Sequence, residues 1–426
     1  MGTLPYRDLL WDFSFSDFGP SNERRNEVRL RVFASEAKLF FRTPDPAAGF
    51  LVTLPLDWLG GAQEGRRSYA QSSPSSDFLL VVGRQLWDAL PEEARKPLLD
   101  AAPERPCRLK ISSVSPAIYD LPWEWLNDGT QPFAMRTGVR LVRSVPIRVP
   151  VPPLTVMPSI QVLLVITNPR DERLLNPFQE IQAVQPRLMQ PPYELRVLEE
   201  PTLKALVAAL REGRGPHIVH YIGHAGLDRG GGNLILHDSY DRTHWISAQE
   251  LADVLPVSVR LLCLSTCFTA PNYQIAGLSR LAHTPATYSL PTAIANRYPV
   301  TEGGVRAFWE AFYHVLAATG GDTGEAFREA QMHCYMAIST GDWGSFSLVI
   351  RDQTGQGFRI EPGEHKLASE PDALTEIQAQ FSAGVANQLA QAMESFEGTP
   401  PDALSRLFEE ESARAARLSG TDKEES

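Results

Sequence analysis

Cysteine is scarce in this chain: there are four among 426 residues, Cys107, Cys263, Cys267 and Cys334. The one close pair, Cys263 and Cys267, lies within an apolar run and lacks the spacing of a zinc site. Residues 1–12 lack the charged-then-apolar pattern of an export signal. Few cysteines and no such signal predict a reducing, cytoplasmic setting.

Long apolar runs and an excess of basic charge are missing as well. No run approaches the roughly 18 apolar residues that cross a bilayer, so we expect no membrane-spanning segment. The formal net charge is −11, whereas general nucleic-acid binders present a basic surface to the phosphates. We therefore expect no general nucleic-acid binding, although a local basic patch stays open.

Several common site motifs are also lacking. The glycines at 230–232 have no Lys-Ser/Thr after them, so they indicate a turn rather than a phosphate-binding loop. No Gly-x-Ser-x-Gly elbow supports a serine hydrolase, and no fixed repeat indicates a helical sensor array. A zinc site is disfavoured because strand alternation scatters the candidate histidines, which are His217, His220, His224 and His237.

Two apolar runs, residues 216–226 and 259–269, carry the most informative pattern. Continuous apolar runs are typical of parallel strands buried on both faces, and open sheets place their chemistry beyond the carboxyl ends of such strands. The runs predict adjacent parallel strands presenting His224 and Cys267. An imidazole near a thiol favours the nucleophilic thiolate. The alternatives are a hydrogen-bonded core histidine and a buried structural cysteine, and we assign the latter role to Cys263.

Glycines flank His224 on both sides, at Gly223 and Gly226. A residue without a side chain lets a substrate backbone approach and leaves amide groups available to an oxyanion. The predicted oxyanion segment comprises Gly223 and Ala225, with the amides of Ala225 and Cys267 as candidate donors.

The sequence resembles the CHAT branch of the caspase-like cysteine peptidases, relatives of caspases and separases. The resemblance rests on His220-Tyr-Ile-Gly-His224-Ala225 and Ser265-Thr-Cys267, supported by residues 121–126 and 296–300. It implies a caspase-type α/β sheet and peptide hydrolysis by a Cys267 and His224 dyad, without metal or organic cofactor. Two departures are Ala225 in place of the usual glycine and Phe268-Thr-Ala270 in place of a polar turn.

The predicted fold is α/β: a caspase-like, mostly parallel sheet flanked by helices, with a smaller N-terminal α/β or strand-rich domain and a C-terminal helical tail. The predicted boundaries are 1–145 for the accessory domain, 146–158 for a proline-rich linker, 159–360 for the protease domain and 361–426 for the tail. Short strands are expected at 28–33, 79–82 and 107–111. Parallel βαβ units should start at 160, and a strand at 346–350 should close the sheet.

The family resemblance assigns the pocket for the residue before the cut to three places: the loop after the first strand, Ser265 and residues 296–297. Asp171 or Glu172 would select a basic side chain before the cut, and Arg170 or Arg297 an acidic one; the prediction favours basic. The expected partners are a protein substrate and an activating protein or upstream protease, as in bacterial defence systems of this family. The alternatives are a catalytically silent scaffold that binds a partner through the helix at 374–396, and a thiol-dependent transferase.

Overall fold

The computed structural model describes residues 7–13, 32–33, 36–41, 50–55, 76–90, 92–104, 106–113, 121–145, 154–156, 159–172, 177–228, 231–268, 279–288, 290–298, 300–338, 341–351, 357–360 and 409. For the first four strands it describes the backbone alone; these are β1 (Arg7–Phe13), β2 (Val32–Phe33), β3 (Glu36–Phe41) and β4 (Phe50–Pro55). The predicted tail beyond residue 361 lies outside the described residues, apart from residue 409.

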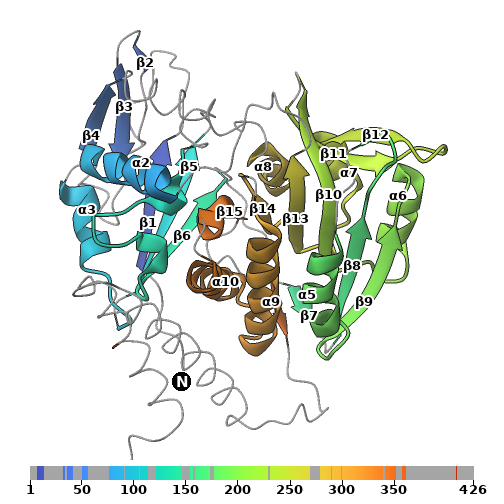
Figure 1. Ribbon diagram of the computed structural model, residues 1–426. Coiled ribbons are helices and arrows are strands. Elements are labelled where there is room, and N and C mark those ends of the chain that lie inside the picture. Colours follow the sequence, from blue (N-terminus) through green and yellow to red (C-terminus); the bar gives the residue numbers. More distant parts are fainter. Residues whose placement is uncertain are drawn as a thin grey trace, which may run out of the picture.

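An eleven-stranded sheet forms the centre of the molecule (Figure 1). Its main path runs β1-β5-β6-β15-β14-β13-β10-β11-β12, and β8 and β9 continue from the first half of β10. The strands after β1 are β5 (Cys107–Ser113), β6 (Val139–Ser144), β8 (Ile160–Ile166), β9 (Tyr193–Glu199), β10 (Ile218–Asp228), β11 (Gly231–His237), β12 (Thr243–Ser247), β13 (Leu261–Phe268), β14 (Thr292–Asn296) and β15 (Phe346–Ile350).

Most neighbouring strands are parallel, as the apolar runs predict. β9, β8, β10, β13 and β14 form one parallel block, and β1, β5, β6 and β15 form another. The blocks meet antiparallel at β14 and β15, and the β11-β12 hairpin adds an antiparallel edge. The fold is therefore a mixed α/β structure with a mostly parallel central sheet, which confirms the predicted fold class.

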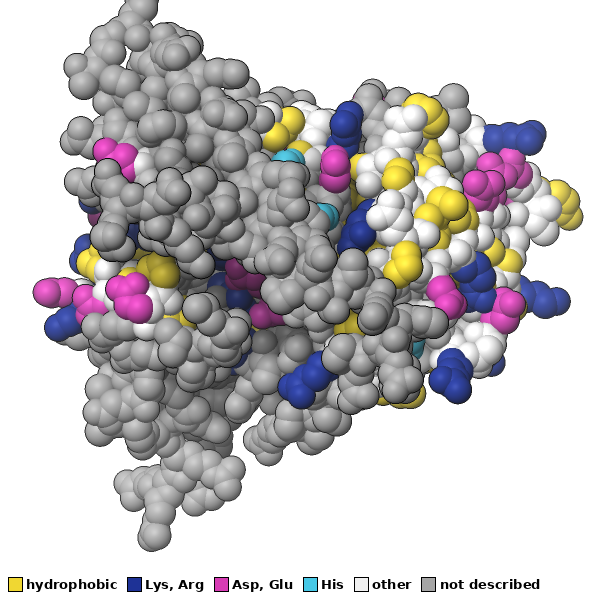
Figure 2. Space-filling view, turned by 90° about the horizontal axis from the view of Figure 1, so that it is seen from below, with side chains coloured by type: hydrophobic (Ala, Val, Ile, Leu, Met, Phe, Trp, Pro, Cys, Tyr) yellow, Lys and Arg dark blue, Asp and Glu magenta, His cyan; other side chains and the backbone are white. Residues whose placement is uncertain are grey.

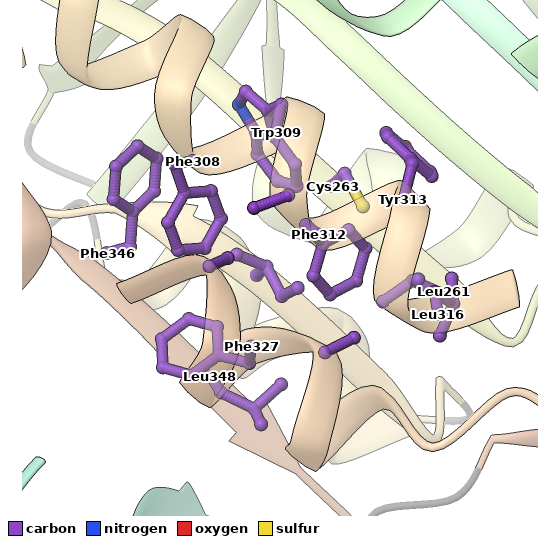
Figure 3. Close-up of a cluster of buried hydrophobic side chains, with 14 of the residues drawn as sticks. Leu261, Cys263, Phe308, Trp309, Phe312, Tyr313, Leu316, Phe327, Phe346 and Leu348 are labelled. Carbon is purple, nitrogen blue, oxygen red and sulfur yellow. The ribbon is translucent and has the colours of Figure 1, made fainter. Parts of the chain in front are cut away.

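Helices cover both faces of the sheet (Figure 1). On one face, α5 (Phe178–Leu188), α9 (Glu302–Ala318) and α10 (Thr323–Ala337) pack in an aromatic core; on the other, α6 (Leu203–Arg211), α7 (Ala248–Val254) and α8 (Ser279–Tyr288) bury aliphatic side chains. Figure 3 shows the aromatic stripe of α9 against side chains of β13 and β15, with Phe308 and Phe346 stacked at 3.7 Å between ring centroids. Helices α2 (Ser76–Ala89) and α3 (Glu92–Leu99) lie beside the N-terminal strands (Figure 1).

The helix starts follow their capping residues. Ser247 and Glu250 form a capping box at the start of α7, and Asp322 caps α10 by accepting from the Glu325 amide at 2.9 Å. These bonds satisfy amides that the first helical turn leaves without intrahelical partners. Local sequence chemistry thus sets where the helices of the βαβ units begin.

The strand predicted at 79–82 is wrong, because these residues lie inside helix α2. Leu79, Val82 and Leu86 are buried at intervals of three and four, whereas Val81 is 55% exposed. This is helical periodicity, which a four-residue apolar run does not reveal on its own.

Strand β15 does not close the sheet as expected. It pairs antiparallel with β14 on one side and parallel with β6 on the other, at Val349 with Arg143 and Ile350 with Ser144. The sheet therefore continues across the boundary predicted at 146–158, because β6 lies before it in the sequence and β15 after it. Within that segment the structure describes β7 (Leu154–Val156), which pairs with β16 (Phe358–Ile360). The division into domains at these positions stays a prediction.

One smaller expectation also changes. The glycine turn is shorter than predicted, because Gly231 and Gly232 already pair with Asp228 and Leu227 in the β10-β11 hairpin.

A buried carboxylate joins the two blocks of the sheet. Glu124, in the 3₁₀ turn Trp123–Trp125, receives hydrogen bonds from Arg143 of β6 at 2.6 and 2.8 Å, and lies 3.3 Å from the guanidinium of Arg297. Ser347 of β15 donates to the same carboxylate at 2.6 Å. Burial by itself would raise the pKa of Glu124, but Arg143 and Arg297 hold it below its ordinary value, so the group is ionised.

The surface mixes both signs of charge. Figure 2, seen from below, shows Lys and Arg side chains beside Asp and Glu side chains over the described part of this face. Among the described residues, no helix is both long and apolar enough to cross a membrane.

Breaking the buried ion cluster should destabilise the whole fold. We expect Arg143→Met to lower the free energy of unfolding by about 3–5 kcal/mol, because Glu124 would stay buried without its main partner. Urea unfolding followed by circular dichroism measures the change. Arg306→Met is the control, because the Arg306–Glu310 pair is exposed and should contribute no more than about 1 kcal/mol. Equal losses in the two variants would contradict this role for Glu124.

Candidate functional site

The two predicted reactive residues lie opposite each other on neighbouring strands. β10 and β13 are parallel, and their register pairs the backbone of His224 with that of Cys267. The structure describes only the backbone at Cys267, and residues 269–278 lie outside the described part. The spatial pairing of the two strands is thus established at the level of the backbone.

Strand alternation defines which face each position shares. On β10, Ile218 and Ile222 pack in the aromatic core beneath α5 and α9, whereas Val219, Tyr221 and Ala225 pack in the aliphatic core. His220 and His224 are in phase with the first set, and both are fully buried. On β13, Leu261 and Cys263 belong to the aromatic core, and positions 265 and 267 are in phase with them. Positions 224 and 267 therefore share a face.

The sequence pattern places His224 at the end of its strand, but in the structure the strand continues beyond it. β10 continues to Asp228, and it changes partner beside His224: the ladder to β8 stops at Ile222, and the ladder to β11 starts at Ala225. The residue therefore lies where one neighbouring strand ends and another begins. This position corresponds to the carboxyl edge of the parallel block even though the chain runs on.

The hydroxyl group of Tyr221 fills this gap between ladders. It lies 2.8 Å from the carbonyl oxygen of His224, 2.7 Å from that of Ile235 and 2.8 Å from Oγ1 of Thr167. Residues from β8, β10 and β11 thus meet at one phenol oxygen. Gly223 is required here because a Cβ would lie 2.1 Å from the Thr167 hydroxyl oxygen and 2.6 Å from the Tyr221 oxygen. The glycine has a packing reason independent of any role in catalysis.

The predicted oxyanion segment is Gly223 and Ala225. Ala225 is fully buried in the aliphatic core on the side of the sheet away from His224, which explains why a methyl group is accommodated at this position. The use of its amide as an oxyanion donor stays a prediction.

A buried carboxylate that the sequence analysis missed connects the two strands beneath the predicted dyad. Glu180 of α5 lies 3.1 Å from Nε2 of His220 and accepts a 2.8 Å hydrogen bond from the hydroxyl of Ser265. Nδ1 of His220 in turn lies 2.7 Å from the hydroxyl of Tyr313. Glu180 is in helical phase with the buried Val184 and Leu188, so a charged residue at a core position of the helix was the available signal.

An aromatic wall from α9 encloses this network. The ring of His220 lies 4.5 Å from that of Trp309 and 5.7 Å from that of Tyr313, measured between centroids. Cys263 belongs to the same core (Figure 3), and burial raises the pKa of its thiol well above the ordinary value. Such a thiol stays protonated and unreactive, which agrees with the structural role predicted for Cys263.

Asn296 at the end of β14 fixes the backbone immediately before Cys267. Its side-chain oxygen accepts from the amide of Thr266 at 2.9 Å, and its amide nitrogen donates to the Thr266 carbonyl at 2.6 Å. The pairing of β13 with β14 stops at Leu264 and Ala295, so the side chain takes over where the ladder ends. A two-sided amide is suited to this task because it both donates and accepts.

The predicted specificity residues occupy different environments. Ser265 is buried and bonded to Glu180, and Arg297 is buried and lies within the Glu124 cluster. Asp171 is exposed and accepts from the amide and hydroxyl of Thr243, both at 2.8 Å, and Glu172 is half-buried beside the same hydroxyl. Arg170 is exposed as well and is paired with Asp241, so three of the candidate residues, Arg170, Asp171 and Glu172, lie at or near the surface.

Glu200, His237 and Asp241 form a group whose ligand atoms lie within 4.8 Å of one another. His237 accepts from the amide of Asn168 through Nε2 at 3.1 Å, so Nδ1 carries the proton and donates to Asp241 at 2.7 Å. Both ring nitrogens are therefore engaged in holding the loop after β8 to the hairpin. A metal ion would have to displace these bonds.

A family model described as the CHAT domain matches residues 80–352. No curated protein matches the sequence. The chain is similar to a chain of the Saccharomyces cerevisiae separase–securin complex, with 14% identity and a TM-score of 0.36, over 60% of this chain and 16% of that one. It thus spans only a small part of that chain's length.

Two structures of a bacterial proteinase are also similar. A complex of the pro- and mature domains of Porphyromonas gingivalis RgpB shows 9% identity and a TM-score of 0.42, over 71% of this chain and 78% of that chain. The Arg-specific cysteine proteinase gingipain R shows 10% identity and a TM-score of 0.40, over 70% and 76%.

The bridge from Glu180 should stabilise the carboxyl edge of the sheet. We expect Glu180→Ala to lower the free energy of unfolding by roughly 2–4 kcal/mol, because it leaves the buried His220 and Ser265 groups without this partner. Chemical denaturation measures the change, with Gln182→Ala on the exposed side of the same helix as control. A loss of unfolding free energy no larger than that of the control would show that the bridge does not stabilise the fold.

Proposed function

Because the chain belongs to the CHAT domain family, we propose that it is a cysteine endopeptidase whose nucleophile is Cys267 and whose proton-transferring group is His224. The register of β10 and β13, which brings the two positions level on one face, is the observation that carries the proposal. His220 and Glu180 support it from below by tying the same two strands together.

In the proposed reaction, His224 accepts the thiol proton of Cys267, and the thiolate attacks the carbonyl carbon of the scissile peptide bond. The tetrahedral intermediate collapses as the C–N bond breaks, and His224 returns the proton to the leaving amine. A water molecule then attacks the thioester, its proton passing to His224 and on to the departing sulfur. Backbone amides of the oxyanion segment, with that of Cys267, would stabilise the negative oxygen.

Burial of His224 supports a regulated rather than a constitutively active enzyme. The side chain is fully buried in this conformation, so a substrate reaches the imidazole only after residues around His224 move. We propose that an activating protein or an upstream protease triggers cleavage of a protein substrate, in a bacterial defence system as the family resemblance implies.

Residue-resolved alkylation tests the dyad before any substrate is identified. We expect Cys267 to react faster below pH 7 than the three other cysteines, because a neighbouring imidazole favours the thiolate. His224→Ala should slow Cys267 by more than tenfold, and His244→Ala, an exposed histidine of β12, serves as control. Cys267→Ala should abolish cleavage while preserving the fold.

The buried thiols provide the internal reference for this measurement. Cys107, Cys263 and Cys334 are all buried thiols that form no disulfide in the described structure. A Cys267 that reacts no faster than Cys263, with and without His224, would contradict a dyad that is active in the isolated chain and would leave a scaffold or an untriggered zymogen. Cleavage by purified Cys267→Ala would contradict it as well.

We further propose that the enzyme cuts after a basic side chain. The arginines that would select an acidic side chain are each paired with a carboxylate of the protein, Arg297 with Glu124 and Arg170 with Asp241. Asp171 instead receives neutral donors from Thr243. Desolvation would raise its pKa, but these hydrogen bonds hold it below the ordinary value, so the carboxylate keeps its charge for a ligand.

A peptide library checks the preference. We expect cleavage mainly after Arg or Lys, and a loss of about tenfold in kcat/KM for such peptides in Asp171→Asn, with Glu199→Gln as a control on the neighbouring strand β9. Cleavage mainly after Asp would reverse the assignment. Product analysis with an added amine separates hydrolysis from transfer, the outcome that a thiol transferase would give.

A catalytically silent scaffold is the competing function. It would bind a partner through residues 374–396, which lie outside the described residues. The presence of both Cys267 and His224 at matched register argues against it, because a scaffold has no use for this pairing.

A further inference from the structure

A large pocket lies at the amino ends of β8, β10 and β13, the ends of the strands opposite to those that carry His224 and Cys267. Its volume is about 930 Å³, within the range of small-molecule sites. Among the described residues, its walls are the starts of β8, β10 and β13, strand β7, and the turn that follows α6. The lining residues used below are Thr155, Arg196, Glu212, Arg214, His217 and Arg260.

The backbone of this pocket is fixed by the strands that carry the candidate site. The amide of Arg260 donates to the carbonyl of His217 at 2.8 Å, and the amide of His217 donates to the carbonyl of Gln161 at 2.8 Å. The amide of Gln161 also donates to Nδ1 of His217 at 3.0 Å. Three strands are therefore tied together at the floor of the pocket, and its shape is largely preformed.

Among the described residues that line the pocket, basic side chains outnumber acidic ones. They are Arg196, Arg214 and Arg260 against Glu212, which is paired with Arg196. Arg260 is only 8% exposed, so its charge acts in a poorly solvated wall, whereas Arg214 is exposed at the rim. Positive charge focused in a concave, partly desolvated site attracts anions more strongly than the same charge on a flat surface.

His217 adds a hydrogen-bond donor. Because Nδ1 accepts from Gln161, the neutral ring carries its proton on Nε2. Burial and the nearby Arg260 lower the pKa of His217, so the ring is neutral near pH 7. A neutral donor beside guanidinium groups suits an anionic oxygen without adding to the repulsion among the cations.

We propose that this pocket binds a small anionic molecule through its phosphate or carboxylate groups. Arg214 and Arg260 supply charge from two walls, and His217 supplies a directional hydrogen bond. Because the pocket is built from the starts of β8, β10 and β13, the ligand would stabilise the same strands that hold the candidate site at their other ends. The proposal does not depend on the protein being a peptidase.

Isothermal titration of the full chain with inorganic pyrophosphate and with citrate tests the proposal, with glucose as the neutral control. We expect saturable one-to-one binding of at least one anion and none of glucose. Tighter binding of pyrophosphate would assign a phosphate ligand, and tighter binding of citrate a carboxylate ligand. Failure of both anions to saturate would overturn the proposal.

Two exposed positions on opposite walls locate the binding without disturbing the core. Arg214→Glu on the turn after α6 and Thr155→Glu on β7 should each weaken binding by at least tenfold. Arg306→Glu and Gln182→Glu, which make the same changes of charge on exposed helix positions away from the pocket, should leave it within twofold. Equal effects in the pocket variants and their controls would place the anion elsewhere and overturn the assignment.

Discussion

The structure depends on one buried carboxylate held by two guanidinium groups. Glu124 contacts Arg143 of β6, Arg297 beyond β14 and Ser347 of β15, and so links the N-terminal block of the sheet to the block that carries the candidate site. An ion group without water is stable only when its charges and hydrogen bonds are matched. The relative position of the two blocks is therefore tied to a small set of charges in the 3₁₀ turn and on two strands.

Side chains supplement the β10–β13 backbone ladder in fixing the region around the candidate site. The ladder from β8 stops before His224, and that from β14 stops before Cys267. Tyr221 and Asn296 make hydrogen bonds at these two places, and Glu180 joins the strands beneath them. A parallel sheet normally leaves the ends of its strands free for chemistry. Here the ends are immobilised by polar side chains, which fixes the backbone at two opposed positions.

Much of the arrangement was predictable because it follows from patterns along the chain. Continuous apolar runs indicated the parallel strands of the central block. The adjacency of β10 and β13 followed from the same reasoning.

Features that depend on contacts distant in sequence were not predictable. The bridge from Glu180 to Ser265 and the pairing of β15 with β6 join residues that no local pattern relates. The strand predicted at 79–82 failed because its apolar residues follow a helical period that extends beyond the short run. Arg297 was assigned to specificity by resemblance, and its pairing with Glu124 was not foreseen because that residue lies in a turn distant in sequence.

The pairing of β6 with β15 has a consequence for how the chain folds. The two strands are separated by about 200 residues, so their contact closes a very long loop, and contacts of this kind form late. During synthesis, β6 leaves the ribosome well before its partner and presents an unpaired strand edge until β15 follows. Such edges are prone to misassembly, so the N-terminal block is at risk of wrong pairing until β15 is available.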